Sequence, residues 1–153
     1  MNEPSGQYQR DIDQLRERLG YDFVSLAFAQ SAQDGFVLTW QYASGNLNDR
    51  YKRIVLQSGK GIAGIVFKTG KPMLVADVKA ELDPNDMFNY PILVSERLSS
   101  LVGIPLYQLD RVEGVLLAGY RGGNAVHNED FRRIYESSNG QIGDFGIKEM
   151  SFP

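Results

Sequence analysis

The sequence predicts a single α+β domain over residues 1–153, with a mainly antiparallel sheet flanked by helices. Three observations lead to this class. A chain of 153 residues is long enough to bury one core of its own. Two pairs of adjacent segments alternate apolar and polar residues and are each joined by a turn, which is typical of hairpins. Segments with helical spacing open the chain, close it, and lie between the two hairpins.

The first half of the chain predicts a helix, a hairpin and a short strand. Apolar residues recur at helical spacing over residues 8–19, and Gly20 then ends this helix. Residues 23–30 form a strand that is apolar on both faces, and residues 36–43 form its hairpin partner. On one face of the second strand we expect Phe36, Leu38, Trp40 and Tyr42.

The second half alternates short strands and helices. A polar loop over residues 44–53 leads to a strand that ends at Gln57. The later elements are a helix over 61–69, a strand over 72–77, a surface loop over 79–89, a helix over 90–98, paired strands over 100–108 and 112–121, and a closing helix over 127–148 with Asn128 as its N-cap. Gly140, Gly143 and Gly146 lie late in the closing helix, which fits either close contact with a helix of a second subunit or a frayed tail.

Composition excludes several classes of function. Lys and Arg number 16 against 19 for Asp and Glu, so no basic excess attracts nucleic acid or an anionic membrane. Cysteine is absent and His127 is the only histidine, which removes thiol catalysis, thiolate metal sites and multi-histidine metal sites. The N-terminal MNEPSGQYQRD lacks the apolar core of a signal peptide, and no stretch approaches the ~20 apolar residues of a membrane span. We therefore expect a cytoplasmic protein without a metal or cofactor.

Residues 59–64, GKGIAG, match the G-x-G-x-x-G fingerprint of dinucleotide-binding turns. A strand precedes the motif, a helix follows it, and Asp77 ends the next strand, where an acidic residue would bind the ribose. The segment is nevertheless shorter than the ~30 residues of a βαβ unit, and hairpin strands precede it. The P-loop pattern fails because Pro72 follows Lys71 in place of Ser or Thr. NAD is therefore a minor alternative.

The small residues of this motif have another use at the start of a helix. First-turn amides carry unpaired N–H groups at the positive end of the helix dipole, so Gly61, Ile62 and Ala63 can bind an anion through the backbone. Alternatively, they only permit tight packing on the sheet. A second short helix begins in the same way at Tyr90. If both helices lie on one face of the sheet, their N-termini suit a small monoanion. Trp40 and Tyr90 are then either apolar walls of the pocket, or Trp40 is an ordinary core residue and Tyr90 a loop anchor.

The element order, the G-x-G-x-x-G before a short helix, the PMLVADV strand and the closing hairpin and helix resemble a GAF domain over residues 8–147. The segment SGNLNDRYKRIVLQSGKGIAGIVFKTGKPMLVADV is similar, more narrowly, to the NreA family of nitrate receptors of staphylococci and related bacilli. This resemblance implies a GAF domain that holds nitrate in a closed, mostly apolar pocket through backbone N–H groups and helix dipoles. It also implies an NreB-type, oxygen-sensing histidine kinase as partner, in a two-component system that controls nitrate respiration genes.

The nitrate-binding residues that this resemblance implies are Trp40, Ile62, Ala63, Tyr90, Pro91 and Ile92, with Gly61 as supporting backbone. Ile62 stands where the family is expected to have leucine, and a backbone donor tolerates that exchange. Neutral donors in a small apolar cage select for low charge and for size. We expect residues 79–89 to form a lid, because a buried ion needs an entry path. The basic stretch from Arg50 to Arg53 is either solvated or contacts the kinase, and a homodimer is left open.

Other functions of GAF domains need residues that this chain lacks. Free methionine sulfoxide reductases and bilin attachment need cysteine, which is absent. Haem needs an axial ligand in the pocket, and His127 instead precedes the last helix, away from the candidate pocket. A cyclic nucleotide is the main alternative ligand, although the N-K-x(n)-F-x-x-x-D-E pattern of that family has no clear match here. The candidate site offers aromatic, apolar and backbone groups instead of an acid, base, nucleophile or metal, so we expect no enzyme. A structural scaffold without a ligand is the third class.

Overall fold

The computed structural model describes residues 4–149. Its strands are β1 (Phe23–Ala32), β2 (Gly35–Ser44), β3 (Val55–Gln57), β4 (Met73–Val75), β5 (Ser100–Gln108), β6 (Arg111–Tyr120), β7 (Gln141–Ile142) and β8 (Phe145–Gly146). Its helices are α1 (Pro4–Leu19), α2 (Gly61–Thr69), α3 (Val78–Glu81), α4 (Pro91–Glu96) and α5 (Asn128–Ser138), with 3-10 turns at η1 (Arg50–Arg53) and η2 (Pro84–Asn89).

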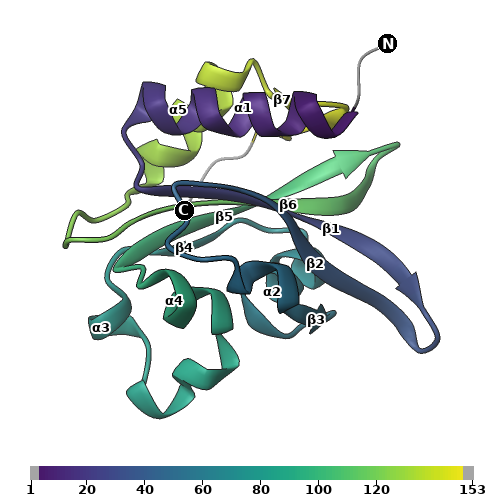
Figure 1. Ribbon diagram of the computed structural model, residues 1–153. Helices are drawn as coiled ribbons and strands as arrows, with labels where there is room; N and C mark the ends of the chain where they lie inside the picture. The colour runs from purple at the N-terminus through teal and green to yellow at the C-terminus, as the bar shows by residue number, and fades with distance from the viewer. Residues whose placement is uncertain (1–3, 150–153) are drawn as a thin grey trace.

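The strands form one sheet in the order β3-β2-β1-β6-β5-β8-β7, and β4 pairs with β5 off this path (Figure 1). All the strand pairs among the described residues are antiparallel. Both predicted hairpins are present, as β1–β2 and β5–β6. In the second, Leu109 and Asp110 adopt φ values of 51° and 64°, the backbone of a tight hairpin turn. The α+β class with a mainly antiparallel sheet is therefore confirmed.

Helices cover both faces of the sheet. α1 and α5 lie on one face, and α2, α3 and α4 lie on the other (Figure 1). Because side chains alternate along a strand, Phe23 and Ala27 point to a different core from Val24 and Leu26. The α2–α4 core consists of Phe23, Ala27, Leu38, Trp40, Ala43, Tyr51, Ile54, Leu56, Ile62, Ala63, Val66, Val75, Val78, Ile92, Leu93, Leu98, Leu101, Val115 and Leu117.

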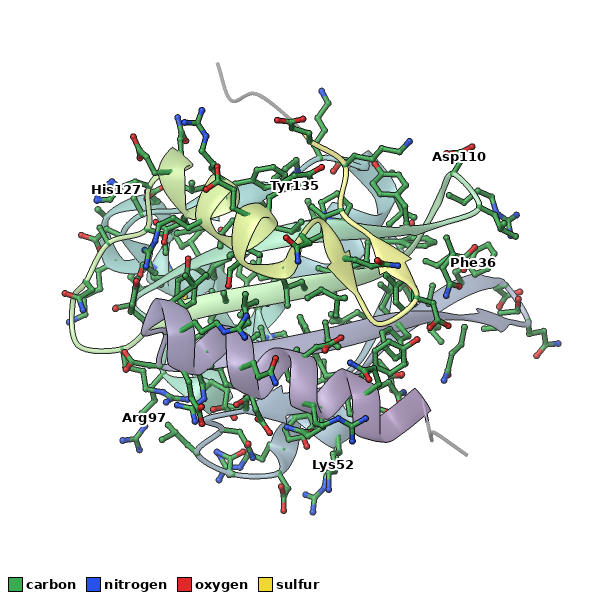
Figure 2. All side chains as sticks on the ribbon, turned by 90° about the horizontal axis from the view of Figure 1, so that it is seen from above. Phe36, Lys52, Arg97, Asp110, His127 and Tyr135 are labelled. Atoms are coloured by element: carbon green, nitrogen blue, oxygen red, sulfur yellow. The ribbon has the colours of Figure 1, made fainter. Side chains whose placement is uncertain are left out.

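The layer made by α1 and α5 faces away from the α2–α4 core. Tyr21, at the start of β1, donates a hydrogen bond of 2.5 Å to the buried carboxylate of Asp130 in α5. The same carboxylate accepts from the backbone amide of His127 at 2.7 Å, so His127 is the N-cap and Asn128 the first helical residue. Viewed onto this layer, His127 lies at the outer end of α5 (Figure 2). The only histidine is thus on the opposite face of the sheet from α2 and α4.

The closing helix is shorter than the expected 127–148. α5 ends at Ser138 because Asn139 and Gly140 follow it with φ values of 57° and 71°, a left-handed conformation that stops a helix. The chain then forms the β7–β8 hairpin, in which Gly143 has a φ of 55° and lies against the ring of Tyr8. Both interpretations of Gly140, Gly143 and Gly146 as residues of a helix were wrong. Gly140 and Gly143 lie in turns, and Gly146 lies in β8.

β2 changes the face of its side chains at a β-bulge. Ala27 pairs with Trp40 and Leu26 pairs with Tyr42, so Gln41 is the extra residue between them. Trp40 therefore lies in the α2–α4 core, whereas Tyr42 packs against the core beneath α1 and α5. The expectation that these two aromatic residues share a face was wrong, because one inserted residue inverts the alternation.

Residues 79–89 are more regular than the predicted surface loop. They hold most of α3 and all of η2, and an aspartate caps each turn. The Asp77 carboxylate accepts a hydrogen bond from the amide of Lys79 at 3.1 Å. The Asp83 carboxylate does the same for the amide of Asn85 at 2.9 Å. The role of aspartate at such positions is to pair amides that have no helical acceptor, so these residues are structural.

Candidate functional site

The G-x-G-x-x-G segment is a closed turn that starts α2. The amide of Gly59 donates to the carbonyl of Gly64 at 2.8 Å, and the amide of Lys60 donates to the carbonyl of Gln57 at 2.9 Å. Gly59 and Gly61 have φ values of 86° and 66°. A Cβ on Gly64 would lie 2.3 Å from the carbonyl oxygen of Gln57. The path of the backbone therefore requires these glycines, whether or not a ligand binds.

The topology separates this segment from a dinucleotide-binding unit. A βαβ unit needs its two strands parallel in one sheet. Here β3 pairs antiparallel with β2, whereas β4 pairs antiparallel with β5, on the other side of β1 and β6. The NAD alternative consequently loses the structural basis that the motif suggested.

The start of α2 presents buried backbone donors. Gly61, Ile62 and Ala63 are its first three residues, and amides at these positions have no acceptor inside their own helix. The N-cap, Lys60, makes no side-chain hydrogen bond to them. Ile62 and Ala63 are both 0% exposed. Buried amides of this kind are normally paired, so the start of α2 is suited to a bound acceptor.

The start of α4 also has an unpaired amide, but only one where α2 has three. Tyr90 is the N-cap, and Pro91 follows it as the first helical residue and has no N–H. The amides of Leu93 and Val94 both donate to the carbonyl of Tyr90, at 3.0 and 3.4 Å. Ile92, which is 1% exposed, is thus the first-turn residue whose amide lacks an acceptor inside α4.

Trp40 adds an unpartnered side-chain donor to the same core. Its ring is 2% exposed, and its Nε1 atom has no hydrogen-bond partner among the described residues. A buried indole N–H usually finds an acceptor, and leaving it unpaired costs about 1–3 kcal/mol. Trp40, Ile62, Ala63 and Ile92 all belong to the α2–α4 core, and Tyr90 packs against it. The structure thus brings the residues singled out from the sequence together on one face of the sheet.

The donors singled out in this layer carry no charge of their own. Glu96 and Asp130 are the buried charged side chains among residues 6–149, and both are acidic. Arg50, Lys52 and Lys60 are exposed. The Arg121 guanidinium lies 5.7 Å from the centre of the Phe23 ring in the α2–α4 core, and it is paired with the Glu96 carboxylate at 2.6 Å. The donors at the starts of α2 and α4 and on Trp40 are neutral, which favours an anion of low charge over sulfate or phosphate.

A GAF-domain family model matches residues 8–144. The chain belongs to the GAF domain family. A solved structure of NreA from Staphylococcus aureus, mutated in its nitrate-binding site, is 42% identical, with a TM-score of 0.75 over 80% of this chain and 88% of that chain. A second structure of such a mutated NreA is 40% identical, with a TM-score of 0.75 over 84% of this chain and 98% of that chain. The resemblance to NreA predicted from the sequence is confirmed.

More distant structures share the GAF fold alone. A free methionine-R-sulfoxide reductase from Neisseria meningitidis is 20% identical, with a TM-score of 0.70 over 90% of this chain and 74% of that chain. None of the curated proteins searched matches the chain. This GAF domain has no helix within residues 4–149 that is long and apolar enough to cross a membrane. Nor do the same residues contain a cluster of three or more His, Asp and Glu side chains suited to a metal ion.

A buried ion pair, which the sequence reasoning missed, holds the end of α4 in this GAF domain. Glu96 is 0% exposed, and its Oε1 atom accepts from the Arg121 guanidinium at 2.6 Å and from the amide of Leu47 at 2.8 Å. Arg121 also donates through Nε to the carbonyl of Glu96 at 2.6 Å. Burial raises the pKa of the Glu96 carboxyl, and the Leu47 amide and Arg121 oppose that rise. The pair ties α4 to the loop after β2 and to the end of β6.

Two surface hollows of this GAF domain lie away from the candidate site. One, of about 170 Å³, lies between α1 and the end of α5 and is lined by Asp11, Arg18 and Ser138 among others. The other, of about 650 Å³, lies beside the β1–β2 turn and is lined by Phe36 and Phe67 among others. The candidate site is therefore defined by buried donors without acceptors, and neither hollow contains them.

Proposed function

We propose that this GAF domain, a single domain over residues 1–153, is a nitrate receptor without catalytic activity of its own. The buried indole N–H of Trp40, which has no acceptor, carries the proposal, because it lies in the same core as the first-turn amides of α2 and of Ile92. The similarity to NreA structures that are described by their nitrate-binding site supports the same ligand.

In the proposed complex, nitrate lies between α2, α4 and the sheet, in a closed and mostly apolar pocket. Its contacts are Trp40, Ile62, Ala63, Tyr90, Pro91 and Ile92, with Gly61 supporting the start of α2. The backbone N–H and the indole N–H can only donate hydrogen bonds, so they match an ion whose oxygens only accept. The positive ends of the two helices add to this preference for an anion. A doubly charged ion would need an unpaired cation, whereas Arg121, the guanidinium beside Phe23 of this core, is paired with Glu96.

The receptor reports to a sensor histidine kinase of the NreB type in the cytoplasm, and its ligand state modulates that kinase in the control of nitrate respiration genes. This part of the proposal rests on the resemblance to NreA. Residues 79–89 act as the lid over the ion. A homodimer is compatible with this role.

Thermal unfolding of the purified protein in sodium salts at constant ionic strength tests the ligand. The panel holds nitrate, nitrite, chloride, iodide and sulfate, with cyclic GMP and NAD alongside. A ligand at ~100 times its dissociation constant stabilises a protein by about 2.7 kcal/mol, which raises the midpoint by several degrees for a domain of this size. We expect a rise with nitrate and none with sulfate.

A cyclic nucleotide is the alternative ligand, because other GAF domains hold one. A flat response to every anion together with a rise for cyclic GMP would replace nitrate by a nucleotide. A flat response to the whole panel would favour a scaffold without a ligand. In either case the unpaired donors of the α2–α4 core would need another acceptor.

A further inference from the structure

We infer that Ser25 is a further ligand contact, whose hydroxyl donates a hydrogen bond to an oxygen of the bound anion from the sheet side of the site. This inference rests on the proposed anion receptor and assigns a residue that neither the motif nor the helix starts single out. The sequence places Ser25 between Val24 and Leu26, in residues 23–29 of β1, which are otherwise apolar.

Ser25 is unusual among the buried serines of the described chain. Its side chain is 0% exposed, and its Oγ atom has no hydrogen-bond partner there. Ser44 accepts a hydrogen bond from the Arg16 guanidinium at 2.8 Å. Ser100 donates to the carbonyl of Asn124 at 2.6 Å. A buried hydroxyl without a partner destabilises the fold, so a hydrogen-bond acceptor from outside the chain would stabilise it here.

The strand register places Ser25 on the same face of the sheet as the candidate site. It lies between Phe23 and Ala27, two members of the α2–α4 core. Its cross-strand partners are Ala43 in β2 and Leu117 in β6, which belong to the same core. Side chains two residues apart on a strand share a face, so the hydroxyl points toward the layer formed by α2 and α4.

Ser25 and Trp40 are close neighbours on that face. Trp40 pairs with Ala27 in the β1–β2 register, and Ser25 is the next residue of β1 on the same side. Diagonal neighbours across two regular strands lie about 7–8 Å apart, and the bulge at Gln41 lies between this pair. The register thus places two buried polar groups without partners among the described residues, an indole N–H and a hydroxyl, on one face of two paired strands.

The geometry gives the site donors from two sides. The helix layer supplies the first-turn amides of α2 and the amide of Ile92, and the sheet supplies Ser25 in β1 and Trp40 in β2. Figure 1 shows α2 and α4 on one face of the sheet. A planar oxyanion with several acceptor oxygens can pair with donors on both sides at once. Among the described residues, Glu96 Oε2 is the other buried side-chain atom without a partner.

Ser25→Ala tests the inference, with Ser100→Ala as the matched control. For Ser25→Ala we expect an unfolding midpoint without nitrate that equals or exceeds the wild-type value, because an unpaired buried hydroxyl is removed. We also expect the nitrate dissociation constant, measured by calorimetric titration, to rise about tenfold or more, as for loss of a hydrogen bond to a charged group. Ser100→Ala should lower the midpoint and leave the nitrate dissociation constant unchanged.

The outcomes separate this inference from the proposed function. If wild type binds nitrate and Ser25→Ala binds it equally well, Ser25 is not a ligand contact. A lower midpoint of Ser25→Ala without nitrate, with unchanged affinity, shows that the hydroxyl stabilises the fold by itself and also overturns the inference. A wild-type protein that does not respond to nitrate overturns the receptor and the serine contact together.

Discussion

Trp40 combines two roles that can be separated by one substitution. Trp40→Phe keeps an aromatic ring in the α2–α4 core and removes the indole N–H. Because that N–H has no partner in the unliganded protein, we expect the free energy of unfolding to change by less than about 1.5 kcal/mol. The nitrate dissociation constant should rise about tenfold or more, since a donor to a charged group is lost. Denaturant unfolding and calorimetric titration measure the two effects.

Ile104→Val is the control for Trp40→Phe, because it removes volume from the opposite core. It should lower the free energy of unfolding by about 0.5–1.5 kcal/mol and leave the nitrate affinity unchanged. Equal nitrate affinities of Trp40→Phe and wild type would remove the indole from the site.

Glu96 gives the stability a pH dependence with a definite sign. Its pKa is raised in the folded protein above the ordinary value of 4.5, mainly by burial, so the folded state binds the proton more tightly than the unfolded state. The stabilisation from this proton is complete below pH 4.5 and is lost as the pH rises through the folded pKa. Relative to Glu96→Gln, wild type should therefore become less stable as the pH is raised from 4.5 toward neutrality.

Denaturant unfolding of both proteins across this range measures that difference. Glu113→Gln, which removes a carboxylate from the partly exposed ion pair with Arg111, controls for the change in net charge. A constant difference between wild type and Glu96→Gln at every pH would show that the buried carboxyl does not titrate in this window.

At the scale of elements, the start of α2 depends on close approach of two backbone segments. Gly64→Ala places a methyl group against the carbonyl oxygen of Gln57, which must move the turn. We expect a loss of about 1–3 kcal/mol in the free energy of unfolding and weaker nitrate binding, because the first-turn amides shift. Gly122→Ala is the control, since Gly122 has a φ of 74° with open space around it. It should cost about 1–2 kcal/mol through backbone strain alone and leave nitrate binding intact.

The outcome of this comparison decides whether the motif serves the ligand or only the fold. If Gly64→Ala loses stability but keeps the wild-type nitrate dissociation constant, the glycines serve packing alone. That is the simpler of the two interpretations that the sequence left open. The turn already requires glycine at position 64 for packing, because a Cβ there would lie 2.3 Å from the carbonyl oxygen of Gln57.

Sequence patterns predicted some of these elements and missed others. Periodicity and cap residues located α1, α2 and α4. Gly20 and Gly70 mark the ends of α1 and α2, and Pro91 marks the start of α4. The end of α5 was missed although Asn139-Gly140 is a typical turn pair, since helical spacing was extended through it. The bulge at Gln41 leaves no periodic trace, because one extra residue changes the face without changing composition.

The site itself could be predicted only where a motif or a resemblance marks it. The helix starts are visible in the sequence, and so is the lone tryptophan. Ser25 is not, because a single serine in a strand becomes informative only when its partners are known to be missing. Glu96 and Arg121 are far apart in the chain, and only the fold brings them together. Long-range pairing of this kind has no local signal.

At the scale of the whole molecule, the sheet separates two layers with different composition. The α1–α5 layer pairs its buried polar groups, as in the hydrogen bond from Tyr21 to Asp130. Among the described residues, the buried side-chain atoms without partners belong to Ser25, Trp40 and Glu96, and all three residues lie on the α2–α4 side of the sheet or in α4. The segment from α3 to η2 borders the second layer, and Leu82 and Met87 anchor it to the α2–α4 core. This position is consistent with the proposal that residues 79–89 form the lid over an ion bound there.

Hydrogen exchange tests this lid. If the ion enters when residues 79–89 open, bound nitrate must leave or be exposed before their amides exchange, so binding raises the free energy of opening. At nitrate concentrations ~100 times the dissociation constant, exchange within residues 79–89 should slow by up to about 100-fold. Amides of α5, in the opposite layer, serve as the internal control and should slow only where they exchange through global unfolding. Unchanged exchange within residues 79–89 while nitrate is bound would place the entry path elsewhere, because a segment that opens without releasing the ion cannot be its lid.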